Sequence, residues 1–261
     1  MIGVYIGVAI VAYFLGSISF SVIFSRKFAG FDVREKGSKN AGSTNVLRTV
    51  GKKAAALTLV CDVLKGVMAI VVAILAGRIW TEVDETLLEY IAGFFAILGH
   101  TFPIFFEFRG GKGVATALGV LITLNWKIGL ICLIFAVIII AFTKMVSVGS
   151  ILAAVLYPIL TIFMGDVKFL PVIISILIAL LVIFNHRENL KRIKNGTEKI
   201  ETGIKKIGAM LGDNVEVGCG SVLNPGTVIG KNTNIYPLSS VRGVVPANSI
   251  YKNKNEIVEK I

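Results

Sequence analysis

Residues 54–77 read AAALTLVCDVLKGVMAIVVAILAG, a long apolar run in which Asp62 and Lys65 are the only charged residues. A helix needs about 20 residues to cross the hydrocarbon core of a bilayer, so this stretch predicts a membrane-spanning helix. Further apolar runs predict spans near 2–24, 87–106, 114–124, 128–142, 147–164 and 169–184. We therefore expect an all-α polytopic membrane protein with about seven transmembrane helices, followed by a different kind of tail.

The runs 114–124 and 128–142 are each short for a full span. Asn125, Trp126 and Lys127 separate them and are suited to an interfacial turn, which favours two spans over one kinked span. The first run lacks a basic start and a small-residue cleavage site, so we expect it to stay in the protein as a span.

The loops on the two sides of the predicted spans differ in charge. One set holds only Arg78, Lys127 and Lys168, with Glu82, Asp84 and Glu85 beside them. The positive-inside rule therefore predicts a cell-membrane protein with its N-terminus outside and its C-terminus in the cytoplasm. The basic residues of the cytoplasmic set are Arg26, Lys27, Arg34, Lys36, Lys39, Arg48, Lys52, Lys53, Arg109, Lys112, Lys144, Arg187, Lys191, Arg192, Lys194, Lys199, Lys205 and Lys206.

The composition of the 261-residue chain excludes several classes of protein. Apolar residues make up 55% and charged residues 16%, which is far too apolar for intrinsic disorder. Three separated Cys and two His exclude a disulfide scaffold and a Cys- or His-rich metal centre. The net charge of +11 could suggest nucleic acid, but in so apolar a chain it indicates cytoplasmic loops facing anionic lipid.

The end of the chain follows a period of six residues. This is the hexapeptide pattern of a β-helix, so we expect domains at 1–202, in the membrane, and 203–261, a β-helix-like tail of about two coils. The tail resembles the C-terminal end of the left-handed β-helix of hexapeptide-repeat transferases but has no His, so we interpret it as a regulatory or oligomerising appendage, or the remnant of a fusion. One end of so short a coil stays open, so the tail either self-associates or is only marginally ordered. The repeated apolar positions are Leu211, Val217, Leu223, Ile229, Ile235 and Val241.

The first polar loop on the basic side runs from Gly37 to Arg48 and reads GSKNAGSTNVLR. Gly allows the backbone to turn its N–H groups toward one point, hydroxyls and amides add neutral donors, and Arg48 adds charge. This composition favours a phosphate-binding loop, and the alternative is a solvated loop between helices. In the next span Asp62 and Lys65 share one helix face. They could form an internal pair or contact this loop, and we interpret them as an internal pair.

The second polar cluster joins His100-Thr101-Phe102-Pro103 to Arg109-Gly110-Gly111-Lys112-Gly113. A Gly-Gly-Lys-Gly turn before a helix offers backbone N–H groups and an ammonium to an anion. It is not a Walker A loop, because Gly113 follows the Lys where Ser or Thr is required. His100 lies just inside a span and is interpreted as a satisfied packing residue.

The third cluster follows the last span and contains His186 and Asn189, three residues apart and able to face one site. The alternative is a juxtamembrane basic helix that binds lipid head groups. Ser147 begins another span on the same side. The three clusters together predict a cationic, donor-rich cavity at the cytoplasmic membrane surface, suited to a small phosphorylated solute and a lipid-like one.

These three motifs resemble the PlsY family of integral-membrane acyl-phosphate:glycerol-3-phosphate acyltransferases. The likeness covers about residues 10–200 and includes Gly16-Ser17-Ile18 with the 37–48 loop, and Gly99-His100-Thr101-Phe102-Pro103 with the 110–116 stretch. The third motif runs from His186-Arg187-Glu188-Asn189-Leu190 to Gly196-Thr197-Glu198. Lys39 stands where the family usually has Gly and Ser43 where it usually has Ala, which bears on substrate affinity more than on activity. The hexapeptide tail is not part of the usual family chain.

The resemblance implies that an acyl phosphate gives its acyl group to the 1-hydroxyl of sn-glycerol 3-phosphate, in the first acylation of bacterial phospholipid synthesis. The products would be lysophosphatidic acid and phosphate, with no metal, nucleotide or other cofactor. The catalytic group implied is Ser38, Arg48, Lys112, His186 and Asn189. Acyl phosphate would be bound by Ser38, Asn40, Gly42, Thr44, Asn45, Gly110, Gly111 and Gly113, and glycerol 3-phosphate by Arg48, Lys112, Ser147, His186 and Asn189.

The proton acceptor of this reaction stays open between a substrate phosphate oxygen, which the resemblance suggests, and His186. Glu198 is interpreted as structural. Two other functions compete with acyl transfer. Polar loops among helices also fit a transporter of a small phosphate ester, and the tail could be the functional part with the membrane region as its anchor.

Overall fold

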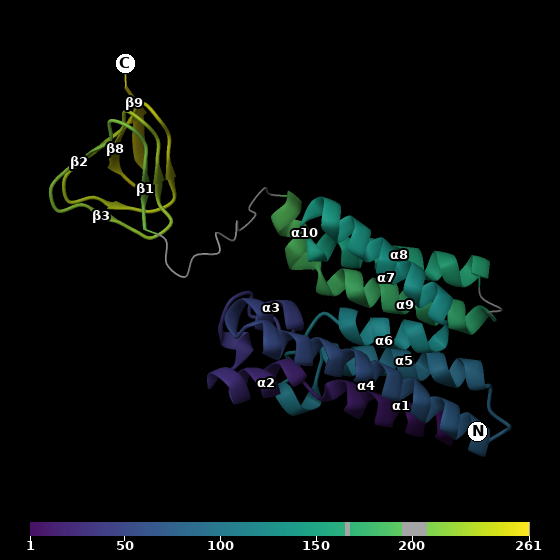
Figure 1. Ribbon diagram of the computed structural model, residues 1–261. Helices are drawn as coiled ribbons and strands as arrows, with labels where there is room; N and C mark the ends of the chain where they lie inside the picture. Colours follow the sequence, from purple (N-terminus) through teal and green to yellow (C-terminus); the bar gives the residue numbers. More distant parts are fainter. Residues whose placement is uncertain (165–167, 195–207, 261) are drawn as a thin grey trace. The chain divides into compact units, whose positions relative to one another are not determined.

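The computed structural model describes residues 1–164, 168–194 and 208–260, without the side chains of residues 191–194. The chain forms two compact units, Met1–Thr197 and Glu198–Ile261 (Figure 1). Each unit is described by itself. The domain boundary predicted between residues 202 and 203 lies outside the described residues, as do Gly196, Thr197 and Glu198 of the third motif.

The first unit is a bundle of apolar helices, which confirms the predicted fold class. Within the described residues, five segments are long and apolar enough to cross a membrane: Ile2–Ala29, Lys52–Ile79, Glu85–Phe106, Trp126–Thr143 and Val146–Met164. The helices are α1 (Ile2–Ser17), α2 (Phe20–Ala29), α3 (Ser43–Thr49), α4 (Lys52–Ile79), α5 (Glu85–Thr101), α6 (Val114–Leu124), α7 (Trp126–Thr143), α8 (Val146–Met164), α9 (Phe169–Asn185) and α10 (Arg187–Lys194), with short 3₁₀ turns η1 (Val33–Glu35) and η2 (Ile104–Phe106).

The first predicted span, 2–24, is interrupted in the structure. Ile18 has an extended backbone and separates α1 from α2. The carbonyl oxygen of Ile18, which no helical N–H can reach at this break, accepts a hydrogen bond of 2.7 Å from Lys65 Nζ on α4. An apolar sequence gives no warning of such a break, because the partner that stabilises it comes from another helix.

Glycines allow the helices to cross closely. A Cβ on Gly16 of α1 would lie 2.1 Å from the carbonyl oxygen of Ala96 on α5. A Cβ on Gly119 of α6 would lie 2.0 Å from the carbonyl oxygen of Val63 on α4. Small residues at such crossings are how membrane helices gain packing without a hydrophobic driving force. These crossings bring the ends of α1, α4, α5 and α6 together beside the polar loops.

The predicted division of 114–142 into two helices is confirmed. Asn125 ends α6 and caps α7, and its Oδ1 accepts hydrogen bonds from the N–H groups of Lys127 and Ile128. A side-chain oxygen that satisfies the first free N–H groups of a helix is a strong local start signal.

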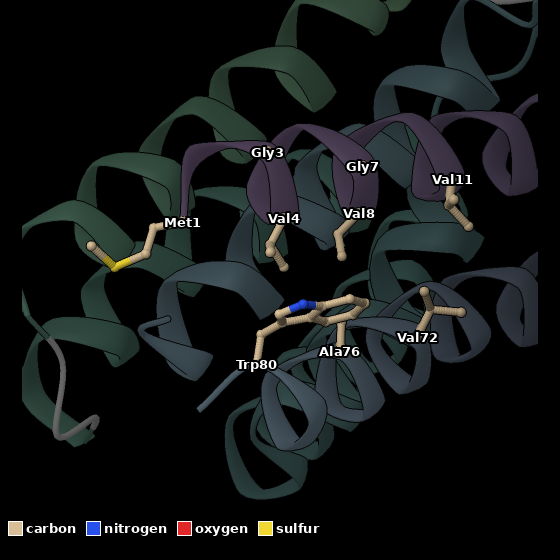
Figure 2. Close-up of a pocket in the computed structure, with 9 residues that line it drawn as sticks. All are labelled: Met1, Gly3, Val4, Gly7, Val8, Val11, Val72, Ala76 and Trp80. Atoms are coloured by element: carbon tan, nitrogen blue, oxygen red, sulfur yellow. The ribbon is translucent and has the colours of Figure 1, made fainter. Parts of the chain in front are cut away.

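Figure 1 places α3 and α10 at one end of the bundle and the N-terminus at the other. A cavity of about 570 Å³ lies at the N-terminal end, away from the polar loops. Figure 2 shows the indole ring of Trp80 lying between α1 and Ala76 of α4 within it. Its lining is almost wholly apolar and consists of Met1, Gly3, Val4, Gly7, Val8, Val11, Val72, Ala76 and Trp80.

The second unit consists of short parallel strands, as the period of six predicts. Its sheets have the orders β1-β4-β7, β2-β5-β8-β9 and β3-β6. Met210 pairs with Val228 and Glu216 with Asn234, the same 18-residue offset that joins Asn214 to Asn232. The strands are β1 (Met210–Leu211), β2 (Glu216–Val217), β3 (Val222–Leu223), β4 (Val228–Ile229), β5 (Asn234–Ile235), β6 (Ser240–Val241), β7 (Val244–Val245), β8 (Ser249–Asn253) and β9 (Glu256–Glu259).

The two ends of this coil differ. Ile229, Ile235 and Val241 are buried in its core, whereas Leu211 of β1 is 52% exposed, because among the described residues β1 pairs with β4 alone. At the other end β9 pairs antiparallel with β8, an addition that the hexapeptide period does not predict. That these strands form a left-handed β-helix, and that the tail self-associates, stay predictions.

Candidate functional site

The first polar loop is shaped around the side chain of Asn45, which is 1% exposed. Its Nδ2 donates hydrogen bonds to the carbonyl oxygens of Val33 (2.9 Å), Lys36 (3.1 Å) and Asn40 (3.1 Å). Its Oδ1 accepts one from the Ser38 N–H at 2.9 Å. A single amide thus satisfies four backbone groups of the loop. The geometry gives Asn45 the task of holding the loop, whereas the resemblance implied a contact with substrate.

The loop is tied to the next polar segment by Arg34. This side chain bonds both carboxylate oxygens of Asp32 and donates to the carbonyl oxygen of Phe106 at 2.7 Å. Burial by itself would raise the pKa of Asp32, but hydrogen bonds and charge from Arg34, with Arg26 beside it, lower that pKa to about 2. The carboxylate therefore stays ionised at any physiological pH, and the link between the two loops persists.

The Gly110–Gly113 turn lies against the end of α5. The N–H of Gly110 donates to the carbonyl oxygen of Thr101, and that of Gly111 to the carbonyl oxygen of His100, both at 3.1 Å. A Cβ on Gly111 would lie 2.2 Å from His100 Nε2 and 2.5 Å from the carbonyl oxygen of Ala41. Only a residue without a side chain fits between the first polar loop and the His100 ring.

Lys112 joins the second and third motifs. Its Nζ donates a hydrogen bond to Asn189 Oδ1 on α10. Lys112 also lies close enough to His186 for its charge to act on that imidazole. Asn185, at the end of α9, donates to Thr101 Oγ1 at 3.1 Å and connects the same two segments a second time.

His186 directly follows α9 as its C-terminal cap and is buried. Its Nδ1 donates to the carbonyl oxygen of Val182 at 2.8 Å, which leaves Nε2 without a proton in the neutral ring. Burial, reinforced by the charge of Lys112, lowers the pKa of His186 to about 4, although the Val182 carbonyl acts in the opposite direction. At neutral pH the ring is therefore uncharged, and Nε2 can accept a hydrogen bond from a hydroxyl group.

A buried charged cluster lies directly beneath the glycine turn. Lys65 Nζ is 3.0 Å from Asp62 Oδ1, which confirms the predicted pair. The same carboxylate oxygen is 3.6 Å from His100 Nδ1. His100 is buried as expected, but it is not a satisfied packing residue, because its Nδ1 has no hydrogen-bond partner among the described residues. Sequence reasoning missed this link because the pair and the ring lie on different helices.

The remaining predicted residues lie around this centre in different ways. Ser38, Thr44 and Arg48 are exposed on the first loop and on α3. Asn40 and Gly42 lie beside them, and a Cβ on Gly42 would be 2.9 Å from Asn40 Nδ2. Ser147 is the second residue of α8, and among the described residues it makes no hydrogen bond to this group. The structure thus brings Lys112, His186 and Asn189 into association and shows no hydrogen bond that joins Ser147 to them among the described residues.

Sequence reasoning placed Thr101 and Asn185 in the polar clusters but gave them no role, whereas in the structure their contact joins α9 to α5. A short polar residue at a helix end is too common to be singled out without its partner. Chemically, the site offers a cation, a neutral imidazole acceptor and many backbone and hydroxyl donors. Such a group can bind two anions and stabilise negative charge that develops between them.

Comparison with known proteins gives a consistent result for the first unit. The family described as glycerol-3-phosphate acyltransferase matches residues 6–196. A glycerol-3-phosphate acyltransferase of Clostridioides difficile strain 630 is 46% identical over 202 residues, which are 77% of this chain and 97% of that protein. One of Shouchella clausii is 44% identical over 196 residues, covering 74% and 94%.

Solved structures agree with these relatives. The chain is similar to a crystal structure of PlsY, an integral membrane glycerol 3-phosphate acyltransferase, in its glycerol 3-phosphate form. The TM-score is 0.68 and the identity 34%, over 76% of this chain and 95% of that one. The lysophosphatidic acid form of PlsY gives a TM-score of 0.65 and 33% identity, over 75% and 94%. The family match ends at residue 196, before the strands of the second unit.

Proposed function

The chain belongs to the glycerol-3-phosphate acyltransferase family and acylates glycerol 3-phosphate to lysophosphatidic acid, and we propose that its acyl donor is an acyl phosphate. In this reaction the 1-hydroxyl oxygen attacks the acyl carbon, and the bond from that carbon to the bridging phosphate oxygen breaks. The hydroxyl proton leaves with the phosphate. Phosphate is a good leaving group from such a mixed anhydride, so the protein has to orient two anions and stabilise developing charge.

The observation that carries the proposal is the hydrogen bond from Lys112 to Asn189, with neutral His186 beside it. It combines a charge for the phosphate of glycerol 3-phosphate with acceptors for its hydroxyl groups. Arg48 and Ser147, which lie on α3 and α8, complete the glycerol 3-phosphate contacts that we propose.

The first loop and the glycine turn are assigned to the acyl phosphate. Ser38, Asn40, Gly42 and Thr44 supply hydroxyl, amide and backbone donors, and Asn45 keeps these donors in place. Gly110, Gly111 and Gly113 allow the donor's phosphate to approach the backbone. Gly113 has φ 82°, a conformation that Gly adopts without strain.

A substrate phosphate oxygen is the proton acceptor that we propose. With a pKa of about 4, His186 is a weak base at neutral pH, and the departing phosphate, which like a phosphate monoester binds a proton with a pKa of at least about 6, is the stronger base. His186 Nε2 then orients the hydroxyl, and the departing phosphate takes the proton. This assignment needs no carboxylate in the group around Lys112.

We further propose that the site faces the cytoplasm, with the N-terminus outside. The charge difference between the two sets of loops supports this orientation. Both substrates are anions, and the basic loops gather at the end of the bundle that holds α3 and α10 (Figure 1).

The donor is tested by supplying purified protein in lipid with glycerol 3-phosphate and, in parallel, palmitoyl phosphate, palmitoyl-CoA or palmitoyl acyl carrier protein. We expect lysophosphatidic acid and stoichiometric phosphate from palmitoyl phosphate alone, and loss of both in Lys112→Met. Lysophosphatidic acid formed only from the two thioesters would contradict the proposal that the donor is an acyl phosphate. Uptake of glycerol 3-phosphate into sealed vesicles without product would instead favour the transporter.

A further inference from the structure

The buried cluster of Asp62, Lys65 and His100 is unusual for its position. All three side chains are at most 7% exposed and lie within membrane-spanning helices. Charged groups in such places are costly and mark internal partners or functional sites. Replacing a buried pair by apolar side chains often stabilises a protein, so packing alone does not explain why these residues are present.

The cluster reaches the glycine turn through one ring. On one side, His100 Nδ1 faces Asp62 Oδ1 at 3.6 Å. On the other, His100 Nε2 is the first atom that a Cβ on Gly111 would meet, at 2.2 Å. The backbone carbonyl of His100 also accepts the Gly111 N–H. The ring and the carbonyl of His100 therefore both lie against the backbone next to Lys112.

The opposite side of the cluster is anchored. Lys65 Nζ bonds Asp62 and also donates to the carbonyl oxygen of Ile18 at the break between α1 and α2. Asp62 Oδ1, which Lys65 Nζ approaches at 3.0 Å, and the buried His100 Nδ1 are 3.6 Å apart, only a few tenths of an ångström beyond hydrogen-bond distance. An unmade hydrogen bond between buried groups favours a small movement that closes it.

We propose that Asp62 is a positioning residue for acyl transfer, which acts through His100 to hold the Gly110–Gly113 turn, and with it Lys112, in the conformation that binds glycerol 3-phosphate. The inference rests on the proposed function of Lys112. Asp62 touches neither substrate. Its effect reaches the site through the contact with the His100 ring. The hydrogen bond between Asp62 and His100 forms when glycerol 3-phosphate binds beside the turn.

The test uses the full-length protein and three changes. Asp62→Asn alone would leave Lys65 as an unpaired buried charge, so Asp62→Asn and Lys65→Met are introduced together. His100→Gln removes the ring, and the triple variant combines all changes. Thr58→Val is the matched control, because Thr58 is fully buried on the same helix and its hydroxyl donates to the carbonyl oxygen of Ala54 within that helix.

We expect the KM for glycerol 3-phosphate to rise about 10- to 100-fold in the paired variant and in His100→Gln, with kcat changed far less. The KM of the triple variant should not exceed the higher of these two KM values, because Asp62 acts through His100 and the effects are not additive. Thr58→Val should leave KM unchanged. An unchanged KM with only a lower melting temperature, or additive effects in the triple variant, would overturn the proposal.

If the paired variant does not fold, the proposal is tested with His100→Gln alone, by the same rise in the KM for glycerol 3-phosphate. Binding is also read without turnover, as the rise in melting temperature that glycerol 3-phosphate produces. Wild-type protein that makes no lysophosphatidic acid would contradict the proposed function. The loss of that rise in the variants, compared with wild type, would still support the positioning role, and an undiminished rise would contradict it.

Discussion

Lys112, in the turn before α6, donates a hydrogen bond to Asn189 on α10, 77 residues further along the chain. This contact holds the second and third polar motifs together at one end of the bundle (Figure 1). It places a cation and an amide beside the buried neutral imidazole of His186. These three side chains offer a charge, an amide and a neutral acceptor to a small anion with hydroxyl groups.

Replacing Asn189 by Leu should lower kcat/KM for glycerol 3-phosphate by roughly 10- to 100-fold, the value of a hydrogen bond to a charged group. The melting temperature should change little, because Asn189 is only half-buried. Steady-state kinetics at varied glycerol 3-phosphate give the result. Arg187→Gln, at an exposed neighbouring residue, is the control. An equal loss of kcat/KM in both variants would contradict a role of Asn189 in binding glycerol 3-phosphate.

Replacing Asn45 by Asp should disable the first loop. A carboxylate in place of the amide would face the carbonyl oxygens of Val33, Lys36 and Asn40 without a proton to donate. Each unsatisfied buried group costs about 1–3 kcal/mol, so we expect near-complete loss of activity and faster proteolysis within the loop. Thr49→Val removes only a bond to the Asn45 carbonyl and should keep most activity. Equal proteolysis of the two variants would contradict the organising role.

The sequence predicts the parts of this site that depend on neighbouring residues in the chain better than the parts that depend on contacts between distant helices. The apolar runs, the turn at Asn125 and the glycine-rich motifs are local signals, and the helices follow them. The break at Ile18 and the contact between Asp62 and His100 depend on partners from other helices. The sequence places Asn45 in the loop, but the presence of an amide side chain does not decide whether that amide bonds a ligand or the backbone of its own loop.

The pH dependence follows from the lowered pKa of His186. The pKa falls from the ordinary 6.5 to about 4 on folding, so between these values the unfolded chain binds a proton that the folded protein does not. Stability contributed by this site is therefore lost as the pH falls from about 6.5 to 4 and is constant above that window. Thermal unfolding of wild type and His186→Gln should differ in slope only in that window.

Activity gives a second view of His186. We expect His186→Gln to keep a residual rate whose pH dependence between 5.5 and 8 matches wild type, because the ring orients the hydroxyl and takes no proton there. Rates at saturating substrates over this range give the comparison. A wild-type inflection that disappears in the variant would assign His186 as the base.

The orientation is tested with thiol labels that do not cross membranes. Cys219 in the second unit is exposed, and the proposed orientation puts it in the cytoplasm. It should resist labelling in intact cells and react after permeabilisation. A cysteine introduced at exposed Glu82, in the loop between α4 and α5, should react in intact cells. The reverse pattern would invert the proposed topology.

The second unit should be dispensable for acyl transfer. A chain ending at residue 202 keeps the region that matches the family, which ends at residue 196. Its rate per folded molecule should lie within about twofold of the full chain, because no residue of the proposed site is removed. Loss of turnover in a truncated protein with an unchanged melting transition would show that the strands contribute to function.

The most direct measurement follows the bridging oxygen of the donor. Palmitoyl phosphate carrying ¹⁸O between carbon and phosphorus is incubated with the protein and glycerol 3-phosphate, and both products are analysed by mass spectrometry. Attack at the acyl carbon predicts one lysophosphatidic acid for each phosphate, with ¹⁸O in the phosphate. Label retained in palmitate, or no product that requires glycerol 3-phosphate, would contradict acyl transfer from an acyl phosphate.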